Sequence, residues 1–236
     1  MGVFDRTTKD GSTQERRSAL EQAETQEEPG FLGGAAVRLV ETLLDSGIDG
    51  RGPFDSAAEV AAAALDSEGS AERAVHHVVS SHVRMGSAFG FVTSVGGVIT
   101  LPVALPANVV GFYLIATRMT AAVATLRGYD ITDPKIRSAV LLTLVGTESH
   151  DLLRKAGAVA PSSAMTNLAT QALPRPALMV VNKAVGFRLL SQAARNTLVR
   201  FGRVVPLVGG AVGAVLDGLL MRSVGASARQ EFPPKA

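Results

Sequence analysis

The clearest pattern along the chain is a long stretch without charge. No Asp, Glu, Lys or Arg occurs between Arg84 and Arg118, and about 20 apolar residues suffice for a helix to cross a bilayer. The stretch carries Pro102, Pro106 and Asn108 near its middle, however. Proline lacks an amide hydrogen and disfavours helical geometry in the residue before it. The pattern therefore predicts a Pro-broken helical hairpin, which is either buried in a bundle or placed at a membrane.

Apolar spacing and turn signals divide the rest of the chain into helices. Residues 31–45 have apolar positions three and four apart, and Asp55 or Ser56 can cap the Ala-rich segment that follows. Asp133 before Pro134 places an acceptor at an N-cap and proline at the first helical position. No segment alternates in the manner of a strand. The expected helices cover residues 31–45, 56–66, 107–126, 134–146, 148–157 and 176–203, with one running from residue 71 into the uncharged stretch and a Gly-rich one after residue 206.

Composition defines the kind of core these helices can build. Hydrophobic residues make up 47% of the 236 residues, but aromatic residues only 5%, and there are 24 glycines and no Trp. Small residues let helix backbones approach one another closely. We therefore predict an all-α, multi-helix bundle with a Gly-rich hydrophobic core. We expect residues 1–30 to form a disordered acidic and polar tail, residues 31–70 to form N-terminal helices, and residues 71–232 to form the main helical domain.

Charge is distributed unevenly between the two ends of the chain. Residues 1–70 hold 6 basic and 14 acidic side chains, a net charge of −8, whereas residues 71–236 hold 17 basic and 7 acidic ones, a net charge of +10. A basic body favours attraction to anionic lipid or another polyanion. The alternative is an ordinary soluble surface that is rich in arginine. The first thirty residues lack the apolar segment of a secretory signal, so we do not expect secretion.

The predicted helix over residues 176–203 is basic on one side. Arg188, Arg195 and Arg203 share that side, and Arg200 lies beside them. The opposite side carries the apolar residues Phe187, Leu190, Ala194, Leu198 and Phe201. Such a helix can lie on an anionic membrane, where each cation contributes about 1 kcal/mol. It can equally be a helix that faces the core and exposes an Arg-rich side to solvent.

The last predicted helix combines small residues with one acid. Gly209 and Gly213 are four residues apart, and so are Gly210 and Ala214, and Ala214 and Gly218. This spacing of small residues permits close helix crossing. Asp217 is the one acidic residue in the apolar part of this helix. A buried carboxylate is costly unless it is paired, so we expect Asp217 to be a buried polar residue with a basic or hydroxyl partner.

Two segments together resemble the EcsC family. In that family a Gly-rich run leads into TLP and LP motifs and a long helix that ends in a GYD-type turn, and a VP-x-x-GG helix with a later Asn or Asp follows near the C-terminus. The matching positions here are Thr100-Leu101-Pro102, Leu105-Pro106, Gly128-Tyr129-Asp130, Val205-Pro206, Gly209-Gly210 and Asp217. The resemblance covers residues 71–232. The family is named from a gene beside a bacterial ABC transporter, and the resemblance implies no catalytic residues for this chain.

Motifs for catalysis, nucleotides and metals are missing from the sequence. It contains no P-loop, no GxGxxG, no GxSxG and no HExxH, and without Cys it can form no disulfide and no Cys-ligated metal site. His76, His77 and His82 are one, five and six residues apart, whereas metal-binding pairs on one helix lie three or four apart. The acids near the turns are interpreted as helix caps and first-turn residues: Asp130, Asp133, Glu148 and Asp151. We predict no metal and no cofactor.

These observations predict a non-enzymatic protein that is cytoplasmic or associates with the cytoplasmic side of a membrane. We expect anionic membrane lipid to be its binding partner. Such a protein can support a transporter or another membrane process, and its acidic tail can contact a protein partner. Few aromatic residues and no binding module argue against nucleic acid. Two alternatives stay open. One is a soluble scaffold with internal apolar helices, and the other is a lipid-binding or lipid-processing protein that uses Asp217 or His150.

Overall fold

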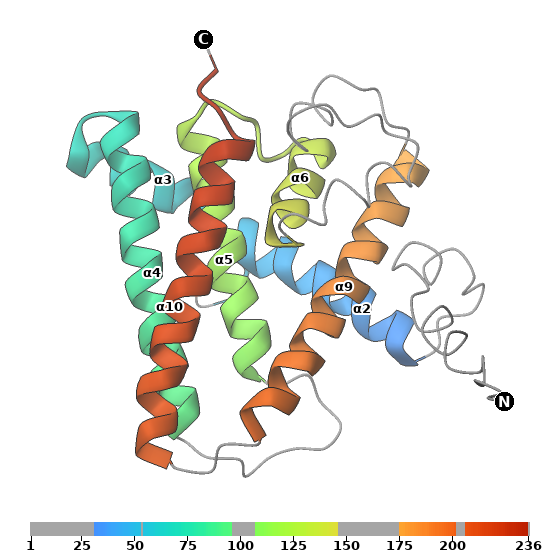
Figure 1. The fold of residues 1–236 in the computed structure, drawn as a ribbon. Coiled ribbons are helices and arrows are strands. Elements are labelled where there is room, and N and C mark those ends of the chain that lie inside the picture. The colour runs from blue at the N-terminus through green and yellow to red at the C-terminus, as the bar shows by residue number, and fades with distance from the viewer. Residues whose placement is uncertain (1–30, 53, 96–106, 146–174, 202–205, 236) are drawn as a thin grey trace, which may run out of the picture.

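The protein is a bundle of helices (Figure 1). The computed structural model describes residues 31–52, 54–95, 107–145, 175–201 and 206–235. All regular structure in these ranges is helical, which confirms the predicted all-α fold. In chain order the elements are α2 (Phe31–Thr42), the π-helical turn η1 (Leu43–Ile48), α3 (Ala57–Glu68), α4 (Ala71–Val95), α5 (Ala107–Leu126), α6 (Pro134–Val145), α9 (Arg175–Phe201) and α10 (Pro206–Glu231).

Helix ends follow the capping signals of the sequence. The Ser56 hydroxyl accepts a hydrogen bond from the Glu59 amide at 3.2 Å, and the Glu59 carboxylate accepts one from the Ser56 amide at 2.8 Å. These two bonds form a capping box at the start of α3. Gly69 ends α3 with φ of +66°, a conformation that favours glycine. At the start of α6, Asp133 accepts a hydrogen bond from the Lys135 amide at 2.9 Å.

Helices α4 and α10 lie side by side and run in opposite directions. In Figure 1, α4 descends from the top of the bundle while α10 ascends beside it, and α5 ascends behind α10. On the other side of the bundle α2 crosses α9, and α6 lies between α9 and α5. The end of α4 and the starts of α5 and α10 therefore meet at the lower end. Pro102 and Pro106, the predicted break between α4 and α5, lie outside the described residues.

Helix α5 is the central helix of the bundle. It packs against α3, α4, α6, α10 and η1. Among the described residues, one segment, Val109–Leu126 within α5, is long and apolar enough to cross a membrane, and 61% of it is buried inside the structure. Length and composition alone do not separate a core helix from a membrane span. Contacts with five neighbouring elements account for the apolar character of α5 without a membrane.

Glycines bring α4 and α10 into close contact. A Cβ added at Gly86 of α4 would lie 3.0 Å from Cε of Met221 on α10. A Cβ at Gly90 would collide with the carboxylate of Asp217, and one at Gly218 of α10 would collide with a side chain of α4. Larger residues at these positions would push the two helices apart. The Gly-rich sequence is therefore used at helix contacts.

Replacing Gly186 by alanine is expected to destabilise the fold by about 1 to 3 kcal/mol, the usual cost of overpacking a core. Gly186 lies where α9 crosses α2, and an added Cβ would be 2.6 Å from the backbone oxygen of Ala36. The matched control is Gly34→Ala on α2, where nothing lies within 4 Å of the added Cβ. That change should stabilise the helix by about 0.5 to 1 kcal/mol. Chemical denaturation measures both, and equal effects would contradict the close crossing.

Candidate functional site

Helix α10 exposes large apolar side chains near its middle. Four of its side chains are about half-exposed to solvent: Val215 (61%), Leu216 (45%), Leu219 (55%) and Leu220 (45%). Their spacing of four residues places them in two adjacent rows on one side of the helix. We call these four residues the apolar face of α10. Exposed apolar residues that occur singly are ordinary, but a contiguous group of this kind marks an interaction site.

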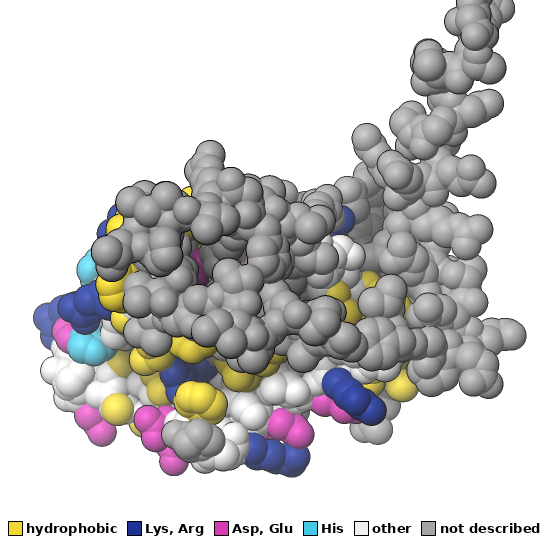
Figure 2. Space-filling view, turned by 90° about the horizontal axis from the view of Figure 1, so that it is seen from below, with side chains coloured by type: hydrophobic (Ala, Val, Ile, Leu, Met, Phe, Trp, Pro, Cys, Tyr) yellow, Lys and Arg dark blue, Asp and Glu magenta, His cyan; other side chains and the backbone are white. Residues whose placement is uncertain are grey.

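The opposite side of α10 is buried and holds the helix in place. Asp217 is 3% exposed, Met221 is fully buried and both face glycines of α4. The apolar face is therefore presented to solvent by a rigid helix, because the contacts with α4 prevent α10 from turning its apolar side chains inward. Figure 2, which looks at the lower end of the bundle, shows hydrophobic side chains in yellow, with a basic side chain among them and acidic side chains at the edge of the view.

A cationic side chain lies beside the apolar face. Arg222 is exposed three residues after Leu219, and residues three apart are neighbours on a helix surface. The acid nearest to the apolar face along α10, Asp217, is buried. The charged side chain that α10 exposes next to the apolar face is therefore a cation.

The arginines predicted to contact lipid occupy α9 and the residues after it. Arg188 is half-buried between Phe187 and Leu189, which are 6% and 0% exposed, and it takes part in an interaction within the structure. Arg195 and Arg200 belong to the last part of α9, but their side chains lie outside what the structure describes, as does all of residue 203. The predicted basic side of this helix stays a prediction.

The glycines predicted to mediate helix packing lie in the first part of α10. Gly213 is buried. Gly209 and Gly210 belong to the first turns of the helix, and their surroundings lie outside the described part of the chain. The packing role of Gly209, Gly210 and Gly213 stays a prediction. Close contacts with α4 are described farther along the helix, at Gly218 and at Gly225, where an added Cβ would lie 2.7 Å from a side chain of α4. The sequence analysis did not single out Gly225.

The structure also brings two buried basic residues together, which the sequence analysis did not predict. His82 of α4 is 3% exposed and Arg118 of α5 is 8% exposed. The His82 Nδ1 donates a hydrogen bond to the Val78 carbonyl at 2.8 Å. Burial is the main cause that lowers the pKa of His82 to about 4. The hydrogen bond to the Val78 carbonyl opposes this shift, and the charge of Arg118 contributes to it. One signal was available, because Arg118 is an isolated cation within an apolar helix.

Acidification from pH 6.5 to about pH 4 is expected to destabilise the protein through His82. In this range the unfolded chain binds a proton that the buried imidazole does not bind, so stability falls as the pH is lowered. The loss reaches up to about 3 kcal/mol, because one pKa unit corresponds to about 1.4 kcal/mol. Denaturation at several pH values should show a flatter pH dependence for His82→Gln. The control is His76→Gln, which changes an exposed histidine of the same helix.

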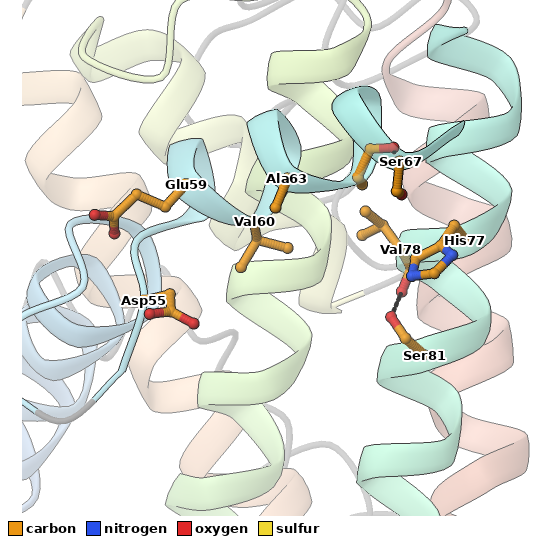
Figure 3. A pocket seen from close by; sticks show the side chains of 9 residues that line it. Asp55, Glu59, Val60, Ala63, Ser67, His77, Val78 and Ser81 are labelled. Carbon is orange, nitrogen blue, oxygen red and sulfur yellow. Dashed lines mark hydrogen bonds between the residues drawn. The ribbon is translucent and has the colours of Figure 1, made fainter. Parts of the chain in front are cut away.

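A groove of about 470 Å³ lies between α3 and α4. Figure 3 shows Asp55 and Glu59 at one end and His77 near the other, with Val60 and Val78 between them. The groove is shallow and its acids are exposed. Among the described residues no group of three or more His, Asp or Glu side chains could hold a metal ion. The groove therefore offers apolar contacts and scattered charges, without a metal site built from these residues.

Comparison with known proteins identifies the family. The profile of the EcsC protein family matches residues 50–233. The match includes α3, the paired helices α4 and α10, and the residues His82 and Arg118. It begins before residue 71, where the sequence analysis placed the start of the resemblance. No curated protein and no solved structure matches the chain. The chain belongs to the EcsC protein family.

Proposed function

We propose that the protein is a non-enzymatic, peripheral membrane protein that binds anionic lipid on the cytoplasmic face of a membrane. The observation that carries this proposal is the apolar face of α10, whose four large side chains are between 45% and 61% exposed. A helix with an apolar side and cationic neighbours can lie in the membrane interface, with the apolar side in the boundary between headgroups and acyl chains. In this proposal α10 is that helix.

The energies favour reversible binding. Full burial of a Val or Leu side chain contributes roughly 1.5 to 3 kcal/mol, so a side chain that is already half-buried contributes about 1 kcal/mol. Arg222, which is exposed beside the apolar face, adds about 1 kcal/mol near an anionic surface. The total of several kcal/mol is comparable to that of other interfacial anchors and far below that of a spanning helix.

The position of α5 favours a peripheral protein over an inserted one. Most of Val109–Leu126 is buried in the bundle, and insertion of this segment alone would remove the core of the fold. The apolar face of α10 can meet lipid without any rearrangement. Helix α9 ends at the same lower end of the bundle as α10 begins (Figure 1), so Arg195, Arg200 and Arg203 are proposed as further contacts to anionic lipid.

The proposal extends to a protein partner at the membrane. The first seventy residues carry a net charge of −8, and an anionic surface would repel them. We propose that this acidic part is directed away from the lipid, where it can contact a membrane transporter or another membrane-bound partner. A pull-down from detergent extracts with the full chain, compared with a chain that begins at residue 31, would identify such a partner.

Flotation with liposomes tests the proposal. The purified full-length chain is mixed with vesicles of phosphatidylcholine alone, or with added phosphatidylglycerol, at low and at high salt. We expect flotation with the anionic vesicles and partial release in high salt, since salt screens the arginines but leaves the apolar contacts. Salt-resistant flotation that needs detergent for release would indicate insertion. Protein that stays at the bottom of the gradient with all vesicles would contradict the proposal and favour a soluble scaffold.

A further inference from the structure

Arg118 is a buried cation without an acidic partner. It is 8% exposed, and no carboxylate oxygen in the described part of the chain lies within 4.0 Å of its guanidinium nitrogens. Its Nη2 donates to the Met85 sulfur at 3.3 Å, and a thioether is only a weak acceptor. Its Nε is buried and has no hydrogen-bond partner among the described residues. The guanidinium therefore holds donors that no acceptor among the described residues uses well.

His82 adds a second unused polar atom next to Arg118. Its Nδ1 donates to the Val78 carbonyl, and its Nε2 is buried with no partner in the described ranges. A buried cation and a buried imidazole nitrogen are both costly when they lack partners. Two such groups on neighbouring helices α4 and α5 are typical of a place where a polar ligand is missing.

Two apolar side chains lie against the guanidinium of Arg118. The Phe54 ring centroid lies 5.5 Å from Cζ of Arg118. Phe54 and Met85 are 44% and 42% exposed, so both extend from the guanidinium to the surface. Asp55 acts on Arg118 through its charge, but it is exposed and forms no ion pair with it. An anion at Arg118 would thus have two large apolar side chains beside it.

We propose that Arg118 binds the phosphate or carboxylate group of an amphiphile, and that Phe54 and Met85 contact its alkyl chain. A guanidinium pairs readily with the oxygens of either anion, and the exposed apolar pair accounts for a chain attached to it. Free phosphate shares the anionic chemistry but lacks the chain. The inference goes beyond the proposed membrane contact, because this site takes one molecule and uses residues of α4, α5 and the segment before α3, whereas the membrane contact uses α10.

Titration calorimetry with the full-length protein tests this inference, with monomeric dodecyl phosphate and inorganic phosphate as the two probes. We expect saturable binding of dodecyl phosphate with one site per chain, and much weaker binding of inorganic phosphate. Arg118→Met should lower the affinity for dodecyl phosphate by about 10- to 100-fold, the usual effect of losing hydrogen bonds to a charged group. The matched control, Arg38→Met, removes an exposed arginine of α2, which belongs to neither proposed site, and should leave the affinity unchanged.

Two further variants separate the parts of the site. Phe54→Ala, at an exposed position, should lower the affinity for dodecyl phosphate and leave the affinity for inorganic phosphate unchanged. Asp55→Asn removes a carboxylate that would compete with an anionic ligand for Arg118, so it should raise the affinity for both probes. If Asp55 were instead the partner of Arg118, the same variant would lower the melting temperature and leave affinity unchanged.

Several results would overturn the inference. These are no binding of dodecyl phosphate by the wild type, equal binding by a folded Arg118→Met, and a wild type that binds inorganic phosphate as tightly as dodecyl phosphate. The last result would assign the site to a free anion. The double variant Leu219→Asp, Leu220→Asp should still bind dodecyl phosphate, so failure of this inference and failure of the proposed membrane contact can be told apart.

Discussion

Replacing Phe232 by alanine is expected to lower the free energy of unfolding by about 3 to 5 kcal/mol, the usual cost of deleting a buried aromatic side chain. Phe232 is fully buried although it lies four residues from the C-terminus. Its ring meets that of Tyr129 edge to face at 5.3 Å, and the amide of Lys235 donates to the Arg127 carbonyl at 3.1 Å. These contacts tie the end of the chain to the end of α5.

Thermal unfolding measures this effect. For a chain of this size 1 kcal/mol corresponds to about 2 to 4 °C, so Phe232→Ala should lower the melting temperature by roughly 6 to 20 °C. The matched control is Phe91→Ala on α4, because Phe91 is 46% exposed and its loss should cost less than about 1 kcal/mol. Similar melting temperatures for the two variants would show that the C-terminal segment does not belong to the core.

The double variant Leu219→Asp, Leu220→Asp is expected to weaken binding to anionic vesicles by about 100-fold or more. It removes half of the apolar face of α10, worth about 2 kcal/mol by the area argument, and it adds two charges that anionic lipid repels. A loss of about 2.7 kcal/mol already corresponds to 100-fold. Flotation at several lipid concentrations gives the apparent affinity. Both side chains are about half-exposed, so the fold should tolerate the change.

Leu65→Asp is the control for this variant. Leu65 lies on α3 and is 42% exposed, which is close to the exposure of Leu220, but it is not part of the apolar face. We expect it to leave vesicle binding within about twofold of the wild type. If Leu65→Asp weakens binding as much as the α10 variant does, general surface charge determines binding, and the apolar face has no special role.

Local sequence signals were sufficient to locate most of the helices. The bounds of α5 agree with the predicted residues 107–126, and α6 begins at Pro134 as predicted. Each of these signals acts within one turn of a helix, through a cap, a missing amide hydrogen or a glycine with positive φ. Such effects depend only on residues that are close in sequence, so they can be identified without knowing the fold. The family, too, was recognised from ordered motifs and is confirmed by the match over residues 50–233.

Contacts between distant segments could not be predicted in the same way. The sequence analysis noted the series of small residues from Gly209 to Gly218, and the structure describes close contact with α4 at Gly218 and also at Gly225, which lies beyond that series. Small residues show where a helix can be approached, but the approaching helix decides which of them is used. The paired hydrogen bonds of 2.7 Å between Arg137 and the Asp49 carboxylate, 88 residues apart, are likewise set by the fold.

The functional surface was difficult to predict for a related reason. Helix α10 is apolar on several sides, so its sequence does not reveal which side is exposed. The structure resolves this because α4 covers the side with Asp217 and Met221 and leaves Leu216 and Leu219 in solvent. In the same way, Arg188 lies on the predicted basic side of α9, but α2 and α6 pack against that helix and Arg188 is half-buried.

Fluorescence of a single introduced tryptophan tests the central claim most directly. The chain contains no Trp, so Leu216→Trp and, as a control, Leu65→Trp each carry one indole, on α10 and α3. With anionic vesicles, we expect the emission of Leu216→Trp to shift to the blue and to be quenched by lipids brominated along the acyl chain, while Leu65→Trp does not change. If the vesicles bind the protein but only Leu65→Trp responds, or neither variant does, the apolar face of α10 is not the membrane contact.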